Sequence, residues 1–408
     1  MTQAPDLDFD VADPGFVREP WHIYQQIRDL GGVVFNRRIN RWMVAGFEDV
    51  RTILTTPTVF GSERGQDEQA GVFGGPTMEF YDGRHHDDIR NIWSDDFRPR
   101  TLAALRPMIA DVVRRRLTPV LDRLAAGEAV EVVTELTRGI PTEVIAHMLG
   151  IEPDMVDRFS AWSDAMGASA EGYTNPGERG ARLIAVGEQA TAELNDYIRT
   201  QIDRRRCPSF AGTDLITTMV RDDYACRHMT EQEIVASNTQ LVFAGNETTA
   251  KLLAQIVVTL AAHPDQRRAI AEDPSLIPAA VEEVHRHETV SHSVFRDAIG
   301  ADARVGGIGV PDGRRLTLLL GAANRDPQRW EHPERFDVFR KKLPHLGFAF
   351  GMHSCLGMNL ARLEGQVFLE ELLTALPEWR VHGPVGYGMN YAVRGPAEVI
   401  ISTARSAA

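Results

Sequence analysis

One of the three cysteines lies in a setting that suits metal chemistry. Cys355 stands between glycines in residues 348–357, called here the cysteine loop, and a helical pattern begins at about Met358. The start of a helix carries unpaired N–H groups and a partial positive charge, and both favour a thiolate over a thiol. Glycines allow a tight turn and leave room for a flat ligand. A lone thiolate with backbone donors suits an axial iron ligand, although a buried free cysteine is the simpler alternative.

A second unusual segment lies in the middle of the longest helical pattern. Residues 244–249 read AGNETT, and glycine and threonine are poor helix formers. We expect the helix to open locally there, with a threonine hydroxyl bonded to a freed carbonyl. The alternative is a site of close helix packing.

Two pairs of charged residues have helical spacing. Glu283 and Arg286 are three residues apart, and His86 and Arg90 are four apart, so each pair shares one face of a helix. Such pairs are common on solvated surfaces and carry little information alone. The two pairs become informative because they occur in a particular order along the chain before the cysteine loop.

Taken together, these segments resemble the cytochrome P-450 family. Its haem-binding signature, Phe-x-x-Gly-x-His/Arg-x-Cys-x-Gly, is matched at Phe348, Gly351, His353, Cys355 and Gly357. The resemblance implies that Cys355 is the proximal thiolate ligand of the iron of haem b. It also implies that Phe348 packs beside the sulfur and that His353 donates to a haem propionate.

The resemblance assigns the mid-helix segment to the distal face of the haem, with Ala244 and Gly245 next to the cofactor. Thr248 would hydrogen-bond to dioxygen during its activation, and Glu247 would admit protons from solvent. Heterolytic cleavage of the O–O bond requires two protons in a site that otherwise excludes water. Glu247 and Thr248 are therefore the expected catalytic residues.

Three cationic residues match positions that hold haem propionates in the family. His86, Arg90 and Arg296 would serve here, because carboxylates in an apolar slot need charged donors.

The resemblance also implies a buried charge network behind the cysteine loop. Its members would be Glu283, Arg286 and Arg335, the last within the family-like run PERF at 333–336. Removing one member should be severe, since an unpaired buried charge costs about 3–5 kcal/mol.

By resemblance, the substrate lies among the 61–83 loop, the mid-helix residues, the 290–295 segment and the 385–391 turn. Polar side chains there predict a mid-sized, mainly apolar substrate with at least one hydrogen-bonding group, since an unpaired buried polar group costs about 1–3 kcal/mol. Alternatively, these side chains point away from the haem and bond to the backbone. The candidate substrate residues are Phe73, Leu241, Val242, Val290, Ser291, His292, Val294, Phe295, Met389 and Asn390.

Most of the elements that must position these residues are helices. Apolar spacing predicts helices over about 20–30, 47–55 and 231–262, and several between 84 and 206. Residues 33–46 predict a hairpin, 296–320 small strands and 393–403 a final strand. The fold class is mainly α with a small β part. It resembles the triangular P-450 fold, a single domain over 1–408 around a buried haem, with 1–17 as an N-terminal arm.

Composition excludes several classes of protein. The 408 residues include 44 Lys and Arg against 57 Asp and Glu, a net charge of −13, which makes a poor nucleic-acid binder. Three cysteines are too few for a disulfide framework, and no apolar run reaches the ~18–20 residues of a membrane span. We expect a cytoplasmic monomer with neither nucleic acid nor membrane as a partner.

The resemblance implies a haem-thiolate monooxygenase that inserts one atom of O2 into a small molecule by hydroxylation, dealkylation or epoxidation. Electrons would come from NAD(P)H through a reductase and an iron–sulfur ferredoxin that docks behind Cys355. The alternatives are a peroxide-driven peroxygenase or rearrangement catalyst of the same fold, and a haem-binding sensor or gas carrier without turnover. The basic residues expected at the docking face are Arg98, Arg100, Lys341, Lys342 and Arg362.

Overall fold

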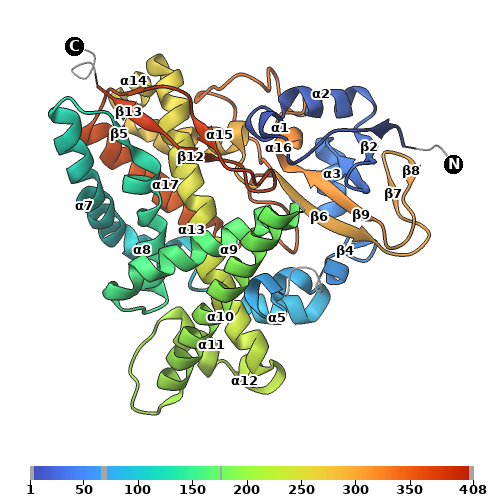
Figure 1. Cartoon of the computed structure of the whole chain (residues 1–408), viewed down its shortest axis with the longest axis horizontal. Helices are drawn as coiled ribbons and strands as arrows, with labels where there is room; N and C mark the ends of the chain where they lie inside the picture. The colour runs from blue at the N-terminus through green and yellow to red at the C-terminus, as the bar shows by residue number, and fades with distance from the viewer. Residues whose placement is uncertain (1–3, 66–70, 175–176, 404–408) are drawn as a thin grey trace.

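The computed structural model describes residues 4–65, 71–174 and 177–403. Helices fill the left and lower parts of the molecule in Figure 1, and the largest sheet lies at the right. The predicted class, mainly α with a small β part, is confirmed. The larger helices are α2 (Trp21–Asp29), α3 (Phe47–Leu54), α5 (Gly83–Ser94), α7 (Arg106–Ala125), α8 (Gly139–Met148), α9 (Val156–Thr174), α10 (Glu178–Arg206), α13 (Glu231–Ala262), α14 (Pro264–Glu272), α15 (Ile277–Glu288) and α17 (Met358–Ala375).

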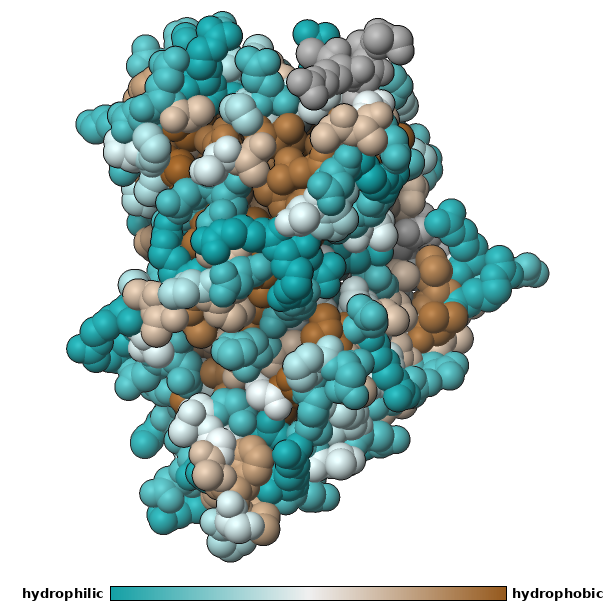
Figure 2. Space-filling model, turned by 90° about the vertical axis from the view of Figure 1, so that its left-hand side faces the viewer, coloured by the Kyte–Doolittle hydropathy of each residue, from teal (hydrophilic) through white to brown (hydrophobic). Residues whose placement is uncertain are grey.

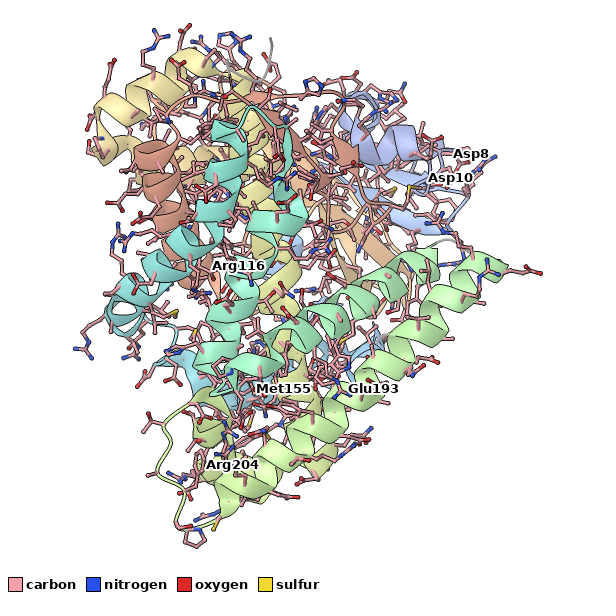
Figure 3. The ribbon with its side chains drawn as sticks, turned by 60° about the vertical axis from the view of Figure 1, so that its left-hand side comes forward. Asp8, Asp10, Arg116, Met155, Glu193 and Arg204 are labelled. Atoms are coloured by element: carbon pink, nitrogen blue, oxygen red, sulfur yellow. The ribbon has the colours of Figure 1, made fainter. Side chains whose placement is uncertain are left out.

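Short helical segments connect the longer ones. Figure 3 shows α9 and α10 side by side along one edge of the molecule, with Glu193 and Arg204 on α10 and Met155 just before α9. The shorter helices are α1 (Pro14–Arg18), α6 (Pro99–Leu102), α11 (Leu215–Arg221), α12 (Asp223–His228) and α16 (Leu320–Ala323), with 3-10 turns that include η1 (Glu63–Gly65) and η2 (Met78–Phe80).

The longest helix, α13, begins at a capping box. The Glu233 backbone N–H donates to the Thr230 hydroxyl at 3.2 Å, and the Thr230 N–H donates to the Glu233 carboxylate at 2.7 Å. These bonds satisfy donors that every helix start leaves unpaired. α13 runs through the helical part and packs against α8, α10, α15 and α17, which explains why most of its length is buried.

The main sheet has the strand order β1-β2-β3-β9-β6-β4. The predicted hairpin is formed by β2 and β3, and β6 pairs antiparallel with β9, so that Arg296 lies opposite Leu316. The strands are β1 (Asp6–Leu7), β2 (Val33–Asn36), β3 (Arg41–Val44), β4 (Phe60–Gly61), β6 (Ser293–Ala298) and β9 (Arg315–Leu319).

The remaining strands form small sheets. The predicted final strand over 393–403 is two strands, β12 (Pro396–Glu398) and β13 (Ile400–Ser402), which belong to different sheets. β12 pairs with β11 (Gly386–Tyr387), and β13 lies between β10 (Arg380–Val381) and β5 (Val130–Glu131). A separate hairpin joins β7 (Arg304–Val305) and β8 (Ile308–Gly309).

Two irregular segments bear on the site. The predicted 61–83 loop contains η1 and η2, and its residues 66–70 lie outside the described part of the chain. The expected N-terminal arm is packed from residue 4 on: β1 pairs with β2, and Phe9, Phe16 and Val17 are buried in the core beside this sheet.

The surface is mixed in polarity. Figure 2 shows one face of the molecule as mostly hydrophilic, with separate hydrophobic areas between polar side chains. Within the described residues, no helix has the length and apolar character needed to cross a bilayer.

Candidate active site

The cysteine loop is a tight turn that places Cys355 just before α17. The Cys355 N–H donates to the Phe348 carbonyl at 2.9 Å. Gly351 has a φ of 74°, and a Cβ there would lie 2.5 Å from the Leu54 carbonyl oxygen, so the turn itself requires glycine. A Cβ on Gly357 would meet no atom within 4 Å, which leaves open space two residues after the cysteine.

Side chains behind the loop hold the Phe348 ring in place. The His285 ring lies 4.4 Å from it between centroids, and the Arg362 guanidinium lies 4.8 Å from its centre. Arg362 also donates to both oxygens of Glu282, at 2.7 and 2.9 Å. Arg362, one of the basic residues expected at the docking face, is therefore already paired with an acid and packed against the cysteine loop.

The electrostatic setting of Cys355 differs from the expectation. Cys355 is exposed, yet protein packed closely around the sulfur desolvates the thiol and raises its pKa, while the Gly357 N–H and the guanidinium groups of Arg90 and Arg362 act in the opposite direction. Desolvation outweighs the helix terminus and the cations. A coordinated metal deprotonates a thiol outright, so a bound metal would itself convert Cys355 to the thiolate, which the helix terminus and the two arginines do not achieve alone.

The middle of α13 faces an internal space. Ala244 is exposed, although buried residues flank it on both sides along this central helix. The Thr248 hydroxyl donates to the Ala244 carbonyl at 2.9 Å, as predicted, but the expected local opening is wrong, because residues 244–249 lie in an uninterrupted helix. Because Ala244 and Thr248 are four residues apart, they lie on one face, with Gly245 beside them.

Glu247 is held by a lysine that the sequence reasoning missed. Lys251 Nζ lies 2.6 Å from the Glu247 carboxylate and donates to the Val393 carbonyl at 2.7 Å. The i, i+4 spacing of an acid and a lysine was the available signal. Lys251 thus links Glu247 to Val393, the residue that forms a β-bridge with Ser291.

Two arginines carry uncompensated charge. Burial lowers the pKa of Arg90 and of Arg296, and within the described chain no carboxylate lies within 4.0 Å of either guanidinium. Arg296 is 8% exposed, and its Nη1 donates to the Phe295 carbonyl at 2.6 Å. Desolvated cations with no acid at ion-pair distance call for an anionic ligand, and haem propionates would satisfy them. With the open space at Gly357, this donor set fits haem.

The two predicted histidines are close together. The rings of His86 and His353 are 4.4 Å apart between centroids, and burial lowers the pKa of both. His353 Nε2 bonds to the Asp82 carboxylate at 2.9 Å, and His86 Nδ1 bonds to Asp87 at 2.9 Å. Each histidine is thus oriented by an acid and keeps one ring nitrogen for a further contact.

The charge network behind the loop has a different third member from the one predicted. Arg286 donates to both Glu283 oxygens at 2.8 Å, as expected. The second arginine on Glu283 is Arg340, at 3.1 Å, and the Asp337 N–H donates to the same carboxylate at 3.0 Å. Arg335 is exposed and contributes only its carbonyl, to Arg286 and Arg340. The family-like PERF run drew attention to the wrong arginine, five residues too early.

The structure does not support His292 as a substrate residue. Its Nδ1 lies 3.0 Å from the Tyr24 hydroxyl, and its Nε2 lies 3.0 Å from the Glu288 carbonyl. The ring also packs 5.5 Å from Trp21. Both nitrogens have partners, so His292 is a packed core histidine, which is the alternative that the sequence left open.

Two apolar candidates face away from the internal space. Side chains alternate along a strand, so Phe295 lies on the opposite face of β6 from Arg296, and the Arg315 guanidinium covers its ring at 4.9 Å. Val242 is buried and lies two residues, roughly 200° around the helix, from Ala244. Both predictions are corrected by the periodicity of the element.

The other predicted pocket residues are placed without such a conflict. Phe73 packs edge-to-face on Phe243 at 5.8 Å, and Asn390 Oδ1 accepts from the Ala392 N–H at 3.0 Å. The remaining candidates are buried or half-buried: Leu241, Val290, Ser291, Val294 and Met389.

Two polar residues near the middle of α13 were missed. Gln240 lies four residues before Ala244 and eight before Thr248, which was a visible signal for the same face. Its Nε2 donates to the Glu79 carboxylate of η2 at 3.0 Å. Nothing in the local sequence of the 61–83 loop singled out Glu79.

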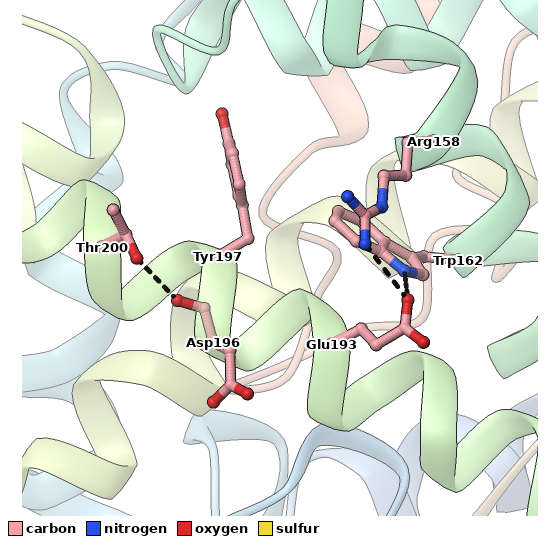
Figure 4. A pocket seen from close by; sticks show the side chains of 6 residues that line it. All are labelled: Arg158, Trp162, Glu193, Asp196, Tyr197 and Thr200. Carbon is pink, nitrogen blue, oxygen red and sulfur yellow. Dashed lines mark hydrogen bonds and ion pairs between the residues drawn. The ribbon is translucent and has the colours of Figure 1, made fainter.

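A surface pocket of about 310 Å³ lies between α9 and α10, lined by Arg158, Trp162, Glu193, Asp196, Tyr197 and Thr200 (Figure 4). Glu193 accepts from the Trp162 indole N–H at 3.0 Å and lies 3.4 Å from Arg158. The polar groups that these bonds join are thus already paired with one another. We assign this pocket no part in the chemistry.

Comparison with known proteins agrees with this geometry. A family described as Cytochrome P450 matches residues 174–377. The chain is 31% identical over 405 residues to Cytochrome P450 107B1 of Saccharopolyspora erythraea, covering 93% of each chain. It is 34% identical over 347 residues to Erythromycin C-12 hydroxylase of the same organism, covering 83% of each.

A solved structure has the same fold. CYP109E1 from Bacillus megaterium, in complex with testosterone, matches with a TM-score of 0.86 at 26% identity, covering 95% of this chain and 98% of that one. With a haem-compatible donor set and relatives that are hydroxylases, the chain belongs to the cytochrome P450 family and is a monooxygenase whose haem iron takes a thiolate ligand.

Proposed function

We propose that this P450 hydroxylates, epoxidises or oxidatively dealkylates a mid-sized, mainly apolar molecule, with electrons from NAD(P)H through a ferredoxin reductase and a ferredoxin. We further propose that residues 1–408 act as one monomeric domain in the cytoplasm, where these donors are available. The observation that carries the proposal is the acid–alcohol pair Glu247–Thr248 in the accessible middle of a buried helix.

The protein's own groups divide the work. Haem bound through the Cys355 thiolate supplies the activation of dioxygen. The haem propionates would be held by His86, Arg90, Arg296 and His353. Gly351 lets the cysteine loop pack against the Leu54 carbonyl, and Gly357 borders open space.

Proton delivery falls to α13. Glu247 would leave Lys251, take a proton from solvent and pass it to the Thr248 Oγ1, while the Thr248 hydroxyl turns from the Ala244 carbonyl and gives its own proton to the oxygen that is being reduced. This route gives the proton a direction in a site that otherwise excludes water. A peroxide-driven enzyme does not need such a route, and a haem sensor needs neither group, so the pair favours the monooxygenase over both alternatives.

The test is oxygen consumption by purified holoenzyme with NADH, ferredoxin and reductase, across a panel of apolar ligands that change the haem spin state. We expect consumption that depends on both ligand and ferredoxin, with an oxygenated product. A parallel reaction with hydrogen peroxide alone serves as control. Product from peroxide alone, with none from the NADH system, would support the peroxygenase, and no product from either would support the sensor.

A further inference from the structure

A cleft of about 260 Å³ lies between α8 and α9 and reaches toward α13. Arg116 of α7, labelled in Figure 3, borders this cleft. Thr142 of α8 also lines it, is 1% exposed, and donates to Asn246 Oδ1 of α13 at 2.8 Å. The cleft therefore leads from the surface to the residue beside Glu247, although Glu247 is not among the described residues that line it.

Asp164 is an acidic residue of α9 in the wall of this cleft. Its side chain is 47% exposed, and Arg138 Nη1 donates to its Oδ2 at 3.3 Å. An acid that is open to solvent on one side exchanges protons with it freely. Asp164 can therefore act as a carrier between solvent and a group that lies deeper.

The carboxylate of Glu247 lies against the same face of α9. A Cβ on Gly167 would lie 3.0 Å from Glu247 Oε2, so this oxygen packs on the bare backbone of the glycine. Lys251 engages the other oxygen, Oε1, at 2.6 Å, which leaves Oε2 facing α9. Asp164 is three residues before Gly167 and shares its helix face, with about 5–6 Å between their Cβ positions. The two carboxylates are thus neighbours, and a short chain of water molecules can bridge them.

The charges of the two acids agree with this geometry. Desolvation by packed protein is the main cause that raises the pKa of Asp164; Arg138 acts in the opposite direction, and the Glu247 carboxylate raises it further. A carboxyl group with a raised pKa carries protons near neutral pH more readily than an ordinary aspartate. The neighbouring acid therefore makes Asp164 better suited to proton transfer.

We propose that this cleft is the entrance for protons and that Asp164 is the positioning residue that relays them from solvent to Glu247. The Asp164 carboxylate takes a proton from water in the cleft, gives it to Glu247 Oε2 through intervening water, and is then a carboxylate again. No electrons move in this step. The inference rests on the proposed function, in which Glu247 takes a proton from solvent, and it names the route.

The experiment compares NADH consumption by the holoenzyme in H2O and in D2O at saturating ferredoxin, with dodecan-1-ol as the probe. Asp164→Asn keeps the shape of the side chain but cannot carry the proton. We expect consumption to slow about fivefold and the solvent isotope effect to become about twice that of wild type, because proton delivery then limits the rate. Affinity for dodecan-1-ol, followed by the haem spin state, should change less than about twofold, since Asp164 faces a surface cleft.

Three further variants separate the relay from general effects of charge or folding. Asp164→Glu keeps a carboxyl group and should retain more than about half of the wild-type rate. Ala161→Phe, at an exposed position three residues before Asp164, fills the cleft without changing a charge and should act in the same direction as Asp164→Asn. Asp157→Asn removes an exposed acid of the same cleft that is ten residues from Gly167, and it should change neither the rate nor the isotope effect.

Equal rates and isotope effects in wild type and Asp164→Asn would overturn the inference. So would equal changes in Asp157→Asn and Asp164→Asn, which would show a general effect of charge. Glu247→Gln, measured in parallel, distinguishes two failures. If it raises the isotope effect while Asp164→Asn does not, the assignment of the cleft fails alone. If neither variant changes the isotope effect, the proposed proton route through Glu247 fails as well.

Discussion

At the scale of single residues, Thr248 has the most direct chemical task. Thr248→Ala removes the hydroxyl that now binds the Ala244 carbonyl and leaves Glu247 in place. Without the hydroxyl, no group hands the proton to the correct oxygen atom. Reduced oxygen should then leave as hydrogen peroxide while NADH is still consumed. The measurement is the ratio of product to NADH, with peroxide determined in parallel.

The matched acid variant acts differently. Glu247→Gln should slow turnover several-fold and leave the spin-state affinity for substrate nearly unchanged, because it removes a proton carrier and keeps its volume. Equal product-to-NADH ratios in wild type and Thr248→Ala would show that this pair does not control oxygen activation.

Arg340 and Arg335 offer a second residue-scale prediction. Arg340 bonds to Glu283 with little solvent around it, whereas Arg335 is exposed. Arg340→Ala should lower the free energy of unfolding by about 3 kcal/mol or more, and Arg335→Ala should change it by less than about 0.5 kcal/mol. Denaturant unfolding of both holoproteins measures this, and the reverse order would restore the sequence-based assignment.

Local sequence motifs predicted some site residues correctly and missed others. A signature of fixed spacing located Cys355, Gly351 and His353 because each one satisfies a local constraint of the same turn. Arg340 and Glu79 escaped because their partners, Glu283 and Gln240, are far away in the sequence. A contact between segments that are distant in the sequence has no characteristic residue spacing from which it could be predicted.

At the scale of elements, α17 carries a buried acid that nothing compensates. Glu364 is 1% exposed, its Oε2 has no partner, and burial raises its pKa to about 8 from its ordinary value of 4.5. The folded protein therefore keeps a proton that the unfolded chain loses above about pH 4.5. Stability should fall from about pH 5 to pH 8, with a slope of up to about 1.4 kcal/mol per pH unit.

Glu364→Gln tests this dependence. The amide cannot ionise, so the variant should lose the decline and be more stable than wild type at pH 8. Unfolding free energies measured between pH 5 and 8 give the slopes, with the exposed Glu378→Gln as control. Parallel slopes in wild type and Glu364→Gln would exclude Glu364 as the titrating group.

Periodicity accounts for both the successes and the errors among the elements. The 231–262 helix and the 33–46 hairpin were predictable because capping and apolar spacing agree there. Phe295 was assigned to the site together with Arg296, although alternation along β6 forbids both from facing it. His292 could not be judged from sequence, because Tyr24, which bonds to it, is 268 residues away.

At the scale of the whole molecule, the electron partner must find a docking face on an acidic protein. Of the five predicted basic residues, Arg362 is bound to Glu282 and Arg98 lies 2.9 Å from Asp95. Lys341 and Lys342 are exposed and have no acid within 4.0 Å in the described chain. The exposed Phe339 beside them adds apolar contact area.

We therefore expect the double variant Lys341→Gln, Lys342→Gln to slow reduction by an acidic ferredoxin and to weaken its salt dependence. Steering between exposed charges fades beyond a Debye length of about 10 Å at 0.1 M salt. Stopped-flow reduction over a range of ionic strength measures both effects. A wild-type rate that does not change with salt would rule out electrostatic docking at this face.

The claim on which everything else depends is that Cys355 ligates the haem iron. The most direct measurement is the Soret band of the reduced carbon-monoxide complex, which thiolate ligation shifts far to the red of histidine ligation. We predict that wild type, Cys207→Ser and Cys226→Ser keep the red-shifted band and that Cys355→Ser loses it. A red-shifted band that survives in Cys355→Ser and disappears in one of the other two variants would contradict the account.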